Sequence, residues 1–118
     1  MTMSQALAGL VGGGWRDRPF EPFAAGIEIS RIVDGAPAVA ILRYEAGASV
    51  PLHRHPGLET ILVLEGAQSD ESGRYEAGAF VLNPAGTQHS VWSDDGCVVL
   101  VQWEKPVVFI APEGPHAA

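Results

Sequence analysis

The chain has 118 residues, 47% of them hydrophobic, and a formal net charge of −7. This length is enough for one hydrophobic core and too short for two domains of ordinary size. The seven Lys and Arg residues are scattered singly, so the acidic chain should repel a nucleic-acid backbone, and we expect no direct nucleic-acid binding.

The first 14 residues contain a short apolar run without a positive segment before it, which argues against a secretory signal. We expect residues 1–14 to form a partly flexible leader, in which Leu7, Leu10 and Val11 make a brief helical turn against the folded domain or a partner subunit. No apolar run approaches the ~20 residues that cross a bilayer, so we expect no membrane association. The single cysteine, Cys97, cannot form an internal disulfide and should be a small buried hydrophobe, which fits a cytoplasmic location.

Residues 15–111 have the pattern of one all-β domain. Short runs rich in Val, Ile and Leu are separated by Gly, Pro, Asp and Asn, and no segment shows helical periodicity over the length of a helix. Strands are predicted at residues 26–32, 38–45, 59–64, 79–82, 88–92, 98–103 and 107–110. Short strands at such regular spacing predict a sandwich or a barrel.

Turns are predicted where Gly follows a small polar residue. Asp34-Gly35, Ser72-Gly73 and Asp95-Gly96 are expected to form hairpin turns. Residues 67–77 are few and polar, and should form a compact hairpin connection that leaves little room for a lid. We expect residues 112–118 to form a flexible tail in which His116 is solvated.

The run from Thr60 to Leu64 is largely apolar on both faces. If Ile61 points into the domain, Leu62 and Leu64 point outward and need cover from another strand, from the N-terminal segment or from a second subunit. This pattern predicts a homodimer.

Four residues at two places in the chain have the spacing of a metal site: His53, His55, Glu59 and His89. Side chains alternate along a strand, so His53 and His55 share a face, and Glu59 keeps that parity if the bend at residues 56–57 preserves the register. His89 would complete the site from a neighbouring strand. The spacing therefore predicts one metal bound by all four.

The donor atoms restrict the metal. Imidazole nitrogens with one carboxylate suit zinc, iron, manganese, nickel or copper, whereas calcium and magnesium prefer oxygen ligands. Four protein ligands on a five- or six-coordinate ion leave positions for water, a substrate or dioxygen. A single His is more often a satisfied polar residue than a ligand, but three of the four histidines fall on these positions. We predict a divalent transition metal with an open coordination position.

Other conspicuous side chains are expected to have structural roles. Arg54 lies between two of the histidines and should point away from both, toward the surface or an ion-pair partner. Large aromatic residues can line a pocket but in a small barrel more often pack in the core, so no catalytic role is expected for Tyr44, Phe80, Trp92 and Trp103.

The spacing extends beyond the four candidate ligands. The first segment reads Gly47(x)5His53-x-His55(x)3Glu59(x)6Gly66, and the second reads Gly78(x)5Pro84-x-Gly86(x)2His89. Both resemble the conserved motifs of the cupin family, except that the second often continues to an Asn where this chain has Ser93. That position is a fold element rather than a ligand. The resemblance implies a double-stranded β-helix, or jelly-roll barrel, in which the glycines and Pro84 are backbone devices at turns.

A narrower resemblance covers residues 15–103 and rests on Trp15, Leu42-Arg43, residues 62–66 and Gly96-Cys97. These are similar to the cupin domain of the ChrR anti-sigma factors. Complete factors of that kind carry a helical sigma-binding domain, with its own zinc site of His and Cys, before the cupin. Only a short Gly-rich leader precedes Trp15 in this sequence, so we do not expect sigma-factor binding.

The resemblance implies two functions of different classes. The first is a metal-dependent enzyme acting on a small molecule, for which dioxygenase chemistry leads because a shell of three His and one Glu is similar to that of cupin dioxygenases. Isomerisation or hydrolysis would suit another metal, and Glu59 is a possible base. The second is a non-catalytic module that senses a small ligand or an oxidant and acts through a protein partner. A metal that only stabilises the barrel is a third possibility.

Overall fold

The computed structural model describes residues 3–110, which form a curled antiparallel barrel of the jelly-roll type, as predicted. Its elements are η1 (Gly14–Asp17, a 3-10 helix), β1 (Glu21–Ala24), β2 (Ile27–Val33), β3 (Ala38–Tyr44), β4 (Ser49–Arg54), β5 (Glu59–Asp70), β6 (Gly73–Glu76), β7 (Phe80–Asn83), β8 (Gln88–Trp92), β9 (Cys97–Trp103) and β10 (Val108–Phe109). Within this range no helix has the length and hydropathy of a membrane span. The expected tail at residues 112–118, with His116, lies outside the described residues.

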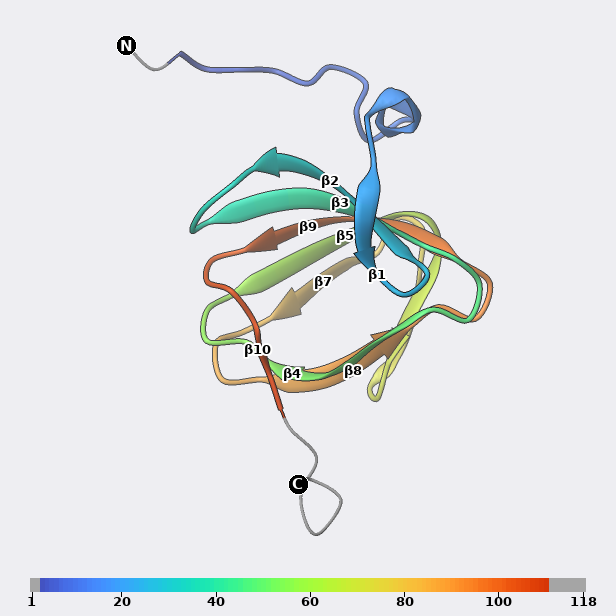
Figure 1. Ribbon diagram of the computed structural model, residues 1–118, viewed down its shortest axis with the longest axis vertical. Helices are drawn as coiled ribbons and strands as arrows, with labels where there is room; N and C mark the ends of the chain where they lie inside the picture. The colour runs from blue at the N-terminus through green and yellow to red at the C-terminus, as the bar shows by residue number, and fades with distance from the viewer. Residues whose placement is uncertain (1–2, 111–118) are drawn as a thin grey trace, which may run out of the picture.

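The strands form one sheet in the order β1-β2-β3-β9-β5-β8-β4-β10, with β6 and β7 also paired to β5. Figure 1 shows β2, β3, β9, β5 and β7 side by side in one layer, with β4 and β8 facing them across the barrel. The long strand β5 belongs to both layers, because its first part pairs with β7 and β9 and its end pairs with β8. Residues from one strand can therefore reach the interior from two sides.

The passage of β5 from one layer to the other depends on Gly66. The register with β9 shifts just before this residue, which has a φ of 71°. A Cβ atom at Gly66 would collide with the carbonyl oxygen of Gly96, so a larger side chain does not fit. The change of direction carries Gln68 and Asp70 into the layer that contains β8.

The predicted strands correspond to β2, β3, β5, β7, β8, β9 and β10, although β5 continues to Asp70. Strand β4 has no counterpart among these ranges and was expected only from the alternation of His53 and His55. The predicted hairpin connection at residues 67–77 contains the end of β5 paired with β6. Sequence patterns do not predict β1 or β6, because almost every side chain in these four-residue strands is exposed and no alternation is visible.

The hairpin predicted at Asp95-Gly96 is wrong. The strand before it, β8, pairs with β4 and β5, whereas the strand after it, β9, pairs with β3 and β5. Residues 93–96 therefore connect the two layers instead of joining paired neighbours. A turn signal in the sequence shows where the chain bends and not which strands it joins.

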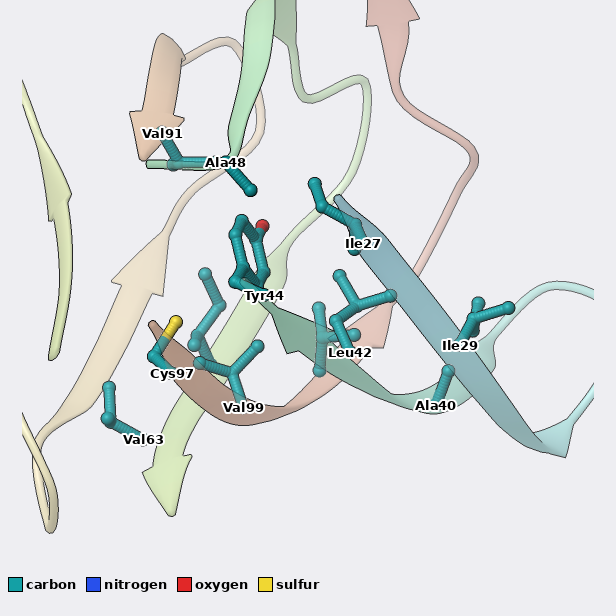
Figure 2. Packing of buried hydrophobic residues seen from close by; sticks show 12 residues of the cluster. Ile27, Ile29, Ala40, Leu42, Tyr44, Ala48, Val63, Val91, Cys97 and Val99 are labelled. Atoms are coloured by element: carbon teal, nitrogen blue, oxygen red, sulfur yellow. The ribbon is translucent and has the colours of Figure 1, made fainter. Parts of the chain in front are cut away.

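Inward-facing side chains of both layers form the core (Figure 2). Along β9, Cys97, Val99 and Val101 point inward, while Val98 and Leu100 point to the outer face. Full burial of one aliphatic side chain contributes ~1.5–3 kcal/mol relative to exposure. Burial also raises the pKa of Cys97 to about 11, so this thiol is protonated at neutral pH, in agreement with its predicted role as a small hydrophobe.

The N-terminal segment covers part of the outer face. Trp15 of η1 and Leu10 pack in a second cluster with Phe20, Ile32, Ile41, Leu64, Val98 and Leu100. Leu64 thus receives cover from its own chain, one of the three sources expected from the sequence. Of the predicted N-terminal turn, Leu10 packs inward, but Leu7 and Val11 are exposed.

Strand β7 leaves apolar side chains uncovered. Phe80 is 61% exposed and Leu82 is 56% exposed, so the prediction that Phe80 lies in the core is wrong. The physical reason is parity, because Phe80 is paired with Leu62, whose side chain faces outward.

Candidate metal centre

Four side chains converge inside the barrel: His53, His55, Glu59 and His89. Their potential ligand atoms lie within 4.8 Å of one another, and all four side chains are buried. His53 on β4 and His89 on β8 are directly opposite each other, Glu59 begins β5, and His55 follows β4. The chain thus brings together every residue of the predicted metal site, and the cluster can hold a metal ion.

Strand alternation explains the inward direction of both histidines of the first motif. His53 and His55 are buried, whereas Arg54 between them is exposed, as predicted. The bend at residues 56–57 returns the chain with Glu59 on the inner face. Strand parity together with this bend therefore accounts for three of the four positions.

Each imidazole uses its Nδ1 atom in a contact with an oxygen acceptor. The partners are the Pro51 carbonyl for His53 at 2.8 Å, the Thr87 hydroxyl for His55 at 3.0 Å and the Asp70 carboxylate for His89 at 3.0 Å. Thr87 donates its own proton to the Pro84 carbonyl at 2.6 Å, so its oxygen is free to accept from His55. In a neutral ring whose Nδ1 carries the proton, Nε2 presents a lone pair.

The Nε2 lone pairs of two of these rings accept no hydrogen bond from the described residues. Nε2 of His55 and Nε2 of His89 are buried and lack a hydrogen-bond partner among the described residues. The Glu59 Oε1 atom lies 3.2 Å from the first and 3.8 Å from the second. A carboxylate this close to two imidazole nitrogens that accept no hydrogen bond can share a cation with them, and this is the observation that fits a metal ion.

Two neutral donors hold the Glu59 carboxylate. Asn83 donates to Oε1 at 2.9 Å and the Trp103 indole donates to Oε2 at 2.6 Å. Both donors are the strand neighbours of Glu59, on β7 and β9. Burial raises the pKa of Glu59, but its contacts with His55 and His89 and the indole N–H outweigh burial, so the pKa lies below its usual range. Glu59 is therefore an anion at neutral pH.

Asp70 forms the most extensive hydrogen-bond network around the cluster. Its Oδ2 accepts from His89, and its Oδ1 accepts from the Ser72 amide at 2.8 Å, the Gly73 amide at 3.2 Å and the Tyr75 hydroxyl at 3.0 Å. Burial would raise the pKa of Asp70, but these hydrogen bonds outweigh it and hold the pKa below its usual range. An ionised Asp70 fixes the tautomer of His89 and makes its Nε2 a stronger donor of electrons.

Burial lowers the pKa of His53, although its hydrogen bond with the Pro51 carbonyl opposes the effect. The ring is therefore neutral at pH 7, and only a neutral imidazole can coordinate a metal.

An apolar cavity opens beside the cluster. The space inside it, counted together with solvent at its open mouth, is about 430 Å³. His53, Glu59 and His89 lie at one end, and the walls include Leu42, Val50, Ile61, Val91, Val99 and Val101. Phe23 of β1 and Phe109 of β10, both partly exposed, line it near the surface. No Lys or Arg between residues 3 and 110 lines this cavity.

A family model described as the ChrR cupin-like domain matches residues 13–106, which is most of the chain. The chain belongs to this family. The match confirms the resemblance drawn from the two motifs and from residues around Trp15 and Gly96-Cys97.

Individual relatives agree with the ChrR cupin-like assignment. The chain is 32% identical over 106 residues to the anti-sigma-E factor ChrR of Cereibacter sphaeroides, covering 87% of this chain but 50% of that protein. It also resembles the crystal structure of Rhodobacter sphaeroides SigE in complex with the anti-sigma ChrR, with a TM-score of 0.73, 29% identity and coverage of 82% of this chain and 55% of that chain. The chain therefore spans about half the length of these relatives.

The fold is shared with more distant structures. An acetylacetone dioxygenase from Acinetobacter johnsonii has a TM-score of 0.73 at 18% identity, covering 84% of this chain and 74% of that one. A putative acetylacetone dioxygenase from Methylibium petroleiphilum has a TM-score of 0.79 at 16% identity, covering 100% and 86%. These likenesses establish the cupin fold of this ChrR cupin-like chain.

Ser93, the one position at which the chain departs from the cupin motif, makes a structural hydrogen bond. Ser93 is fully buried, and its hydroxyl donates to the Ala67 carbonyl at 2.7 Å. Its backbone amide donates to the Ala48 carbonyl, and its carbonyl accepts from the Gly47 amide. Ser93 thus ties the start of β4 to β5 and lies outside the candidate metal cluster, as expected of a fold element.

Sequence reasoning missed the residues that orient the cluster in this ChrR cupin-like chain. Asp70 carries only a turn signal, because Asp followed three residues later by Gly is typical of a hairpin. Trp103 was expected to be a core aromatic, yet its indole donates to Glu59. Its parity with Val99 and Val101 on β9 places it on the inner face, and that signal could have identified it.

Proposed function

We propose that His53, His55, Glu59 and His89 bind one divalent transition metal, and that this centre oxidises a small organic molecule in a dioxygenase-type reaction. The supporting observation is the set of buried imidazole lone pairs that face an ionised Glu59 beside an apolar cavity. Imidazole and carboxylate donors suit iron, zinc, manganese or nickel. Iron would supply the redox chemistry with dioxygen, which zinc cannot.

The protein's own groups have defined parts in this proposal. The three rings present Nε2 because Pro51, Thr87 and Asp70 hold their Nδ1 protons. The cavity walls exclude bulk water from the reacting end of a substrate. Two hydrogen bonds to Glu59 reduce its basicity, which supports a role as a ligand more than the role as a base that its sequence position also suggests.

Oxygen consumption tests the proposed reaction. Protein without an affinity tag, stripped by a chelator and reloaded anaerobically with one equivalent of ferrous iron, should consume dioxygen when 2,4-pentanedione or a related β-dicarbonyl is added. The zinc-loaded protein should show no uptake, because zinc has no accessible redox change. The measurement is made with an oxygen electrode, and product analysis should show cleavage or oxygenation of the dicarbonyl.

A lack of uptake by the stoichiometrically iron-loaded protein with β-dicarbonyl, enol and thiol substrates would contradict the enzymatic proposal. It would favour a second candidate, a sensing module that acts through a protein partner. The observation behind this alternative is the identity with the anti-sigma factor ChrR, which exceeds that with the dioxygenases. Recovery of one specific protein partner with the metal-loaded chain would support it.

We also propose that the protein forms a homodimer. The exposed Phe80 and Leu82 form an apolar edge beside the outward-facing Leu62 on the same layer. Sedimentation velocity at high micromolar concentration should give the mass of a dimer, and Leu82→Glu should shift the equilibrium to monomer because it places a charge in an apolar contact. A monomer in the parent protein at that concentration would contradict the proposal. We further propose a cytoplasmic location, which fits the single free cysteine, Cys97.

A further inference from the structure

A pair of buried polar side chains lies in the cavity away from the metal cluster. Tyr44, at the end of β3, is 4% exposed, and Gln68, on β5, is 3% exposed. The Gln68 Nε2 atom donates to the Tyr44 hydroxyl oxygen at 3.3 Å, and both residues line the cavity. Figure 2 shows the Tyr44 hydroxyl at the tip of a ring surrounded by aliphatic side chains and pointing toward the side where Ala48 lies.

This pair has more hydrogen-bond donors than its internal contact uses, because the Gln68 amide carries two N–H groups and Tyr44 one O–H group. When Gln68 donates to the Tyr44 oxygen, the phenolic proton of Tyr44 is left to be donated elsewhere. If the amide is turned so that its oxygen accepts that proton, the NH2 group of Gln68 becomes the free donor. In either arrangement the pair presents a donor in an otherwise apolar part of the cavity, and burial of an unused donor is unfavourable.

The pair and the metal cluster lie at opposite ends of one strand. Tyr44 is paired with Cys97 at the start of β9, whereas Glu59 is paired with Trp103 at its end. Between them the inner face is formed by Val99 and Val101. A molecule that contacts both ends would therefore lie along β9 with its middle part against aliphatic side chains.

The charge of the cavity restricts that molecule further. The ionisable groups that line the cavity are the cluster residues His53, Glu59 and His89, together with Tyr44. Because no lining Lys or Arg in the described part of the chain offsets a distal carboxylate or phosphate, such a group would lie unpaired among apolar walls. Burial also raises the pKa of Tyr44, so its hydroxyl remains a donor at neutral pH.

We propose that Tyr44 and Gln68 form a second polar subsite that binds a carbonyl or ether oxygen at the far end of a small, uncharged and largely apolar ligand. The other end of this ligand lies at the His and Glu cluster. This inference rests on the proposed metal function, since it takes the cluster as the place where the first end binds. It makes Tyr44 a determinant of specificity and gives the segment around Gln68 a direct role in ligand binding.

The test uses hydroxamic acids, which coordinate metals, as probes. A series of increasing chain length is prepared in two forms, one with a plain alkyl end and one with a ketone near that end. Zinc-loaded protein is titrated by calorimetry. At the length that spans the cavity, the ketone form should bind about 3- to 10-fold more tightly than the alkyl form, the effect of one neutral hydrogen bond.

Because Gln68 also offers N–H donors, Tyr44→Phe alone should reduce this preference, and the double variant Tyr44→Phe with Gln68→Met should abolish it. Tyr44→Phe keeps the aromatic ring in the core, so its zinc content and melting temperature serve as controls for folding. Gln68→Met, which keeps the length of the side chain, should reduce the preference less, because the Tyr44 hydroxyl remains.

Three results would overturn the proposal: equal affinity for the two forms at every length, an unchanged preference in the double variant Tyr44→Phe with Gln68→Met, or no binding of either form by the zinc-loaded parent. Zinc does not react with dioxygen, so these titrations are independent of the oxygen-uptake experiment. Failure of oxygen uptake with a normal ketone preference would overturn the proposed reaction and leave the subsite intact. Loss of the ketone preference with normal oxygen uptake would overturn the subsite and leave the proposed reaction intact.

Discussion

Protein with the double substitution His53→Ala and His89→Ala should retain no stoichiometric metal after purification without an affinity tag. The two rings face each other across β4 and β8, so their removal leaves only His55 and Glu59 of the cluster. Loss of a single outer hydrogen-bond partner typically weakens metal affinity by about 10- to 100-fold, and loss of two ligands should exceed the upper value. Metal analysis of dialysed protein gives the content, and competition with a chromophoric chelator gives the affinity.

The same substitution should remove the stabilisation that metal gives. A ligand at 100 times its dissociation constant raises the free energy of unfolding by about 2.7 kcal/mol, provided that it does not bind the unfolded chain. Zinc should therefore raise the melting temperature of the parent and leave that of the double variant unchanged. Arg54→Ala is the matched control, since Arg54 lies between two of the histidines but is exposed. Equal metal content in the parent and the double variant would show that the metal is bound elsewhere.

The four cluster residues could be predicted because their positions follow from local geometry. Alternation along one strand places His53 and His55 on the inner face, and the motif spacing adds Glu59 and His89 without knowledge of the pairing. The strand order could not be obtained in this way. The error at Asp95-Gly96 shows why: the same turn residues suit a hairpin and a crossing between layers.

The residues around the cluster depend on pairing between strands that are distant in the sequence. Asn83 and Trp103 reach Glu59 because β7 and β9 flank the start of β5, and Asp70 reaches His89 because β5 changes layers at Gly66. Spacing within one segment carries no information on such contacts. Residues 67–77 were therefore expected to be only a connection, whereas they supply Asp70 as the hydrogen-bond partner of His89.

Burial of outward-facing leucines illustrates the same limit. The alternation in β5 correctly predicts that Leu64 faces outward. The sequence did not decide whether another strand, the N-terminal segment or a second subunit covers this side chain. The structure covers it with Trp15, the first residue of the predicted domain, and with Leu10, from the leader turn that was expected to pack against the domain or a partner subunit. Phe80 was misassigned because its hydrophobicity indicates a preference for burial, while its parity with Leu62 decides its direction.

Asp70→Asn should weaken zinc binding by about 10- to 100-fold through the tautomer of His89. In the parent, Oδ1 accepts from Ser72, Gly73 and Tyr75, while Oδ2 accepts from the Nδ1 proton of His89. Asparagine has one acceptor oxygen, and the three donors of the turn should hold it. Its NH2 group would then face Nδ1 of His89, which must become the acceptor.

The proton of His89 would move to Nε2, the atom that faces the cluster, and a protonated Nε2 cannot coordinate a metal. Chelator competition at neutral pH measures the loss, and the melting temperature in chelator should change little because the oxygen that holds the turn is retained. Glu71→Gln is the matched control: it removes the neighbouring negative charge, but Glu71 is exposed and accepts from Ser90 and not from His89. If both variants weakened zinc binding equally, the negative charge near the site and not the direction of one hydrogen bond would set the affinity. If Asp70→Asn bound zinc as tightly as the parent, Asp70 would be only a turn residue.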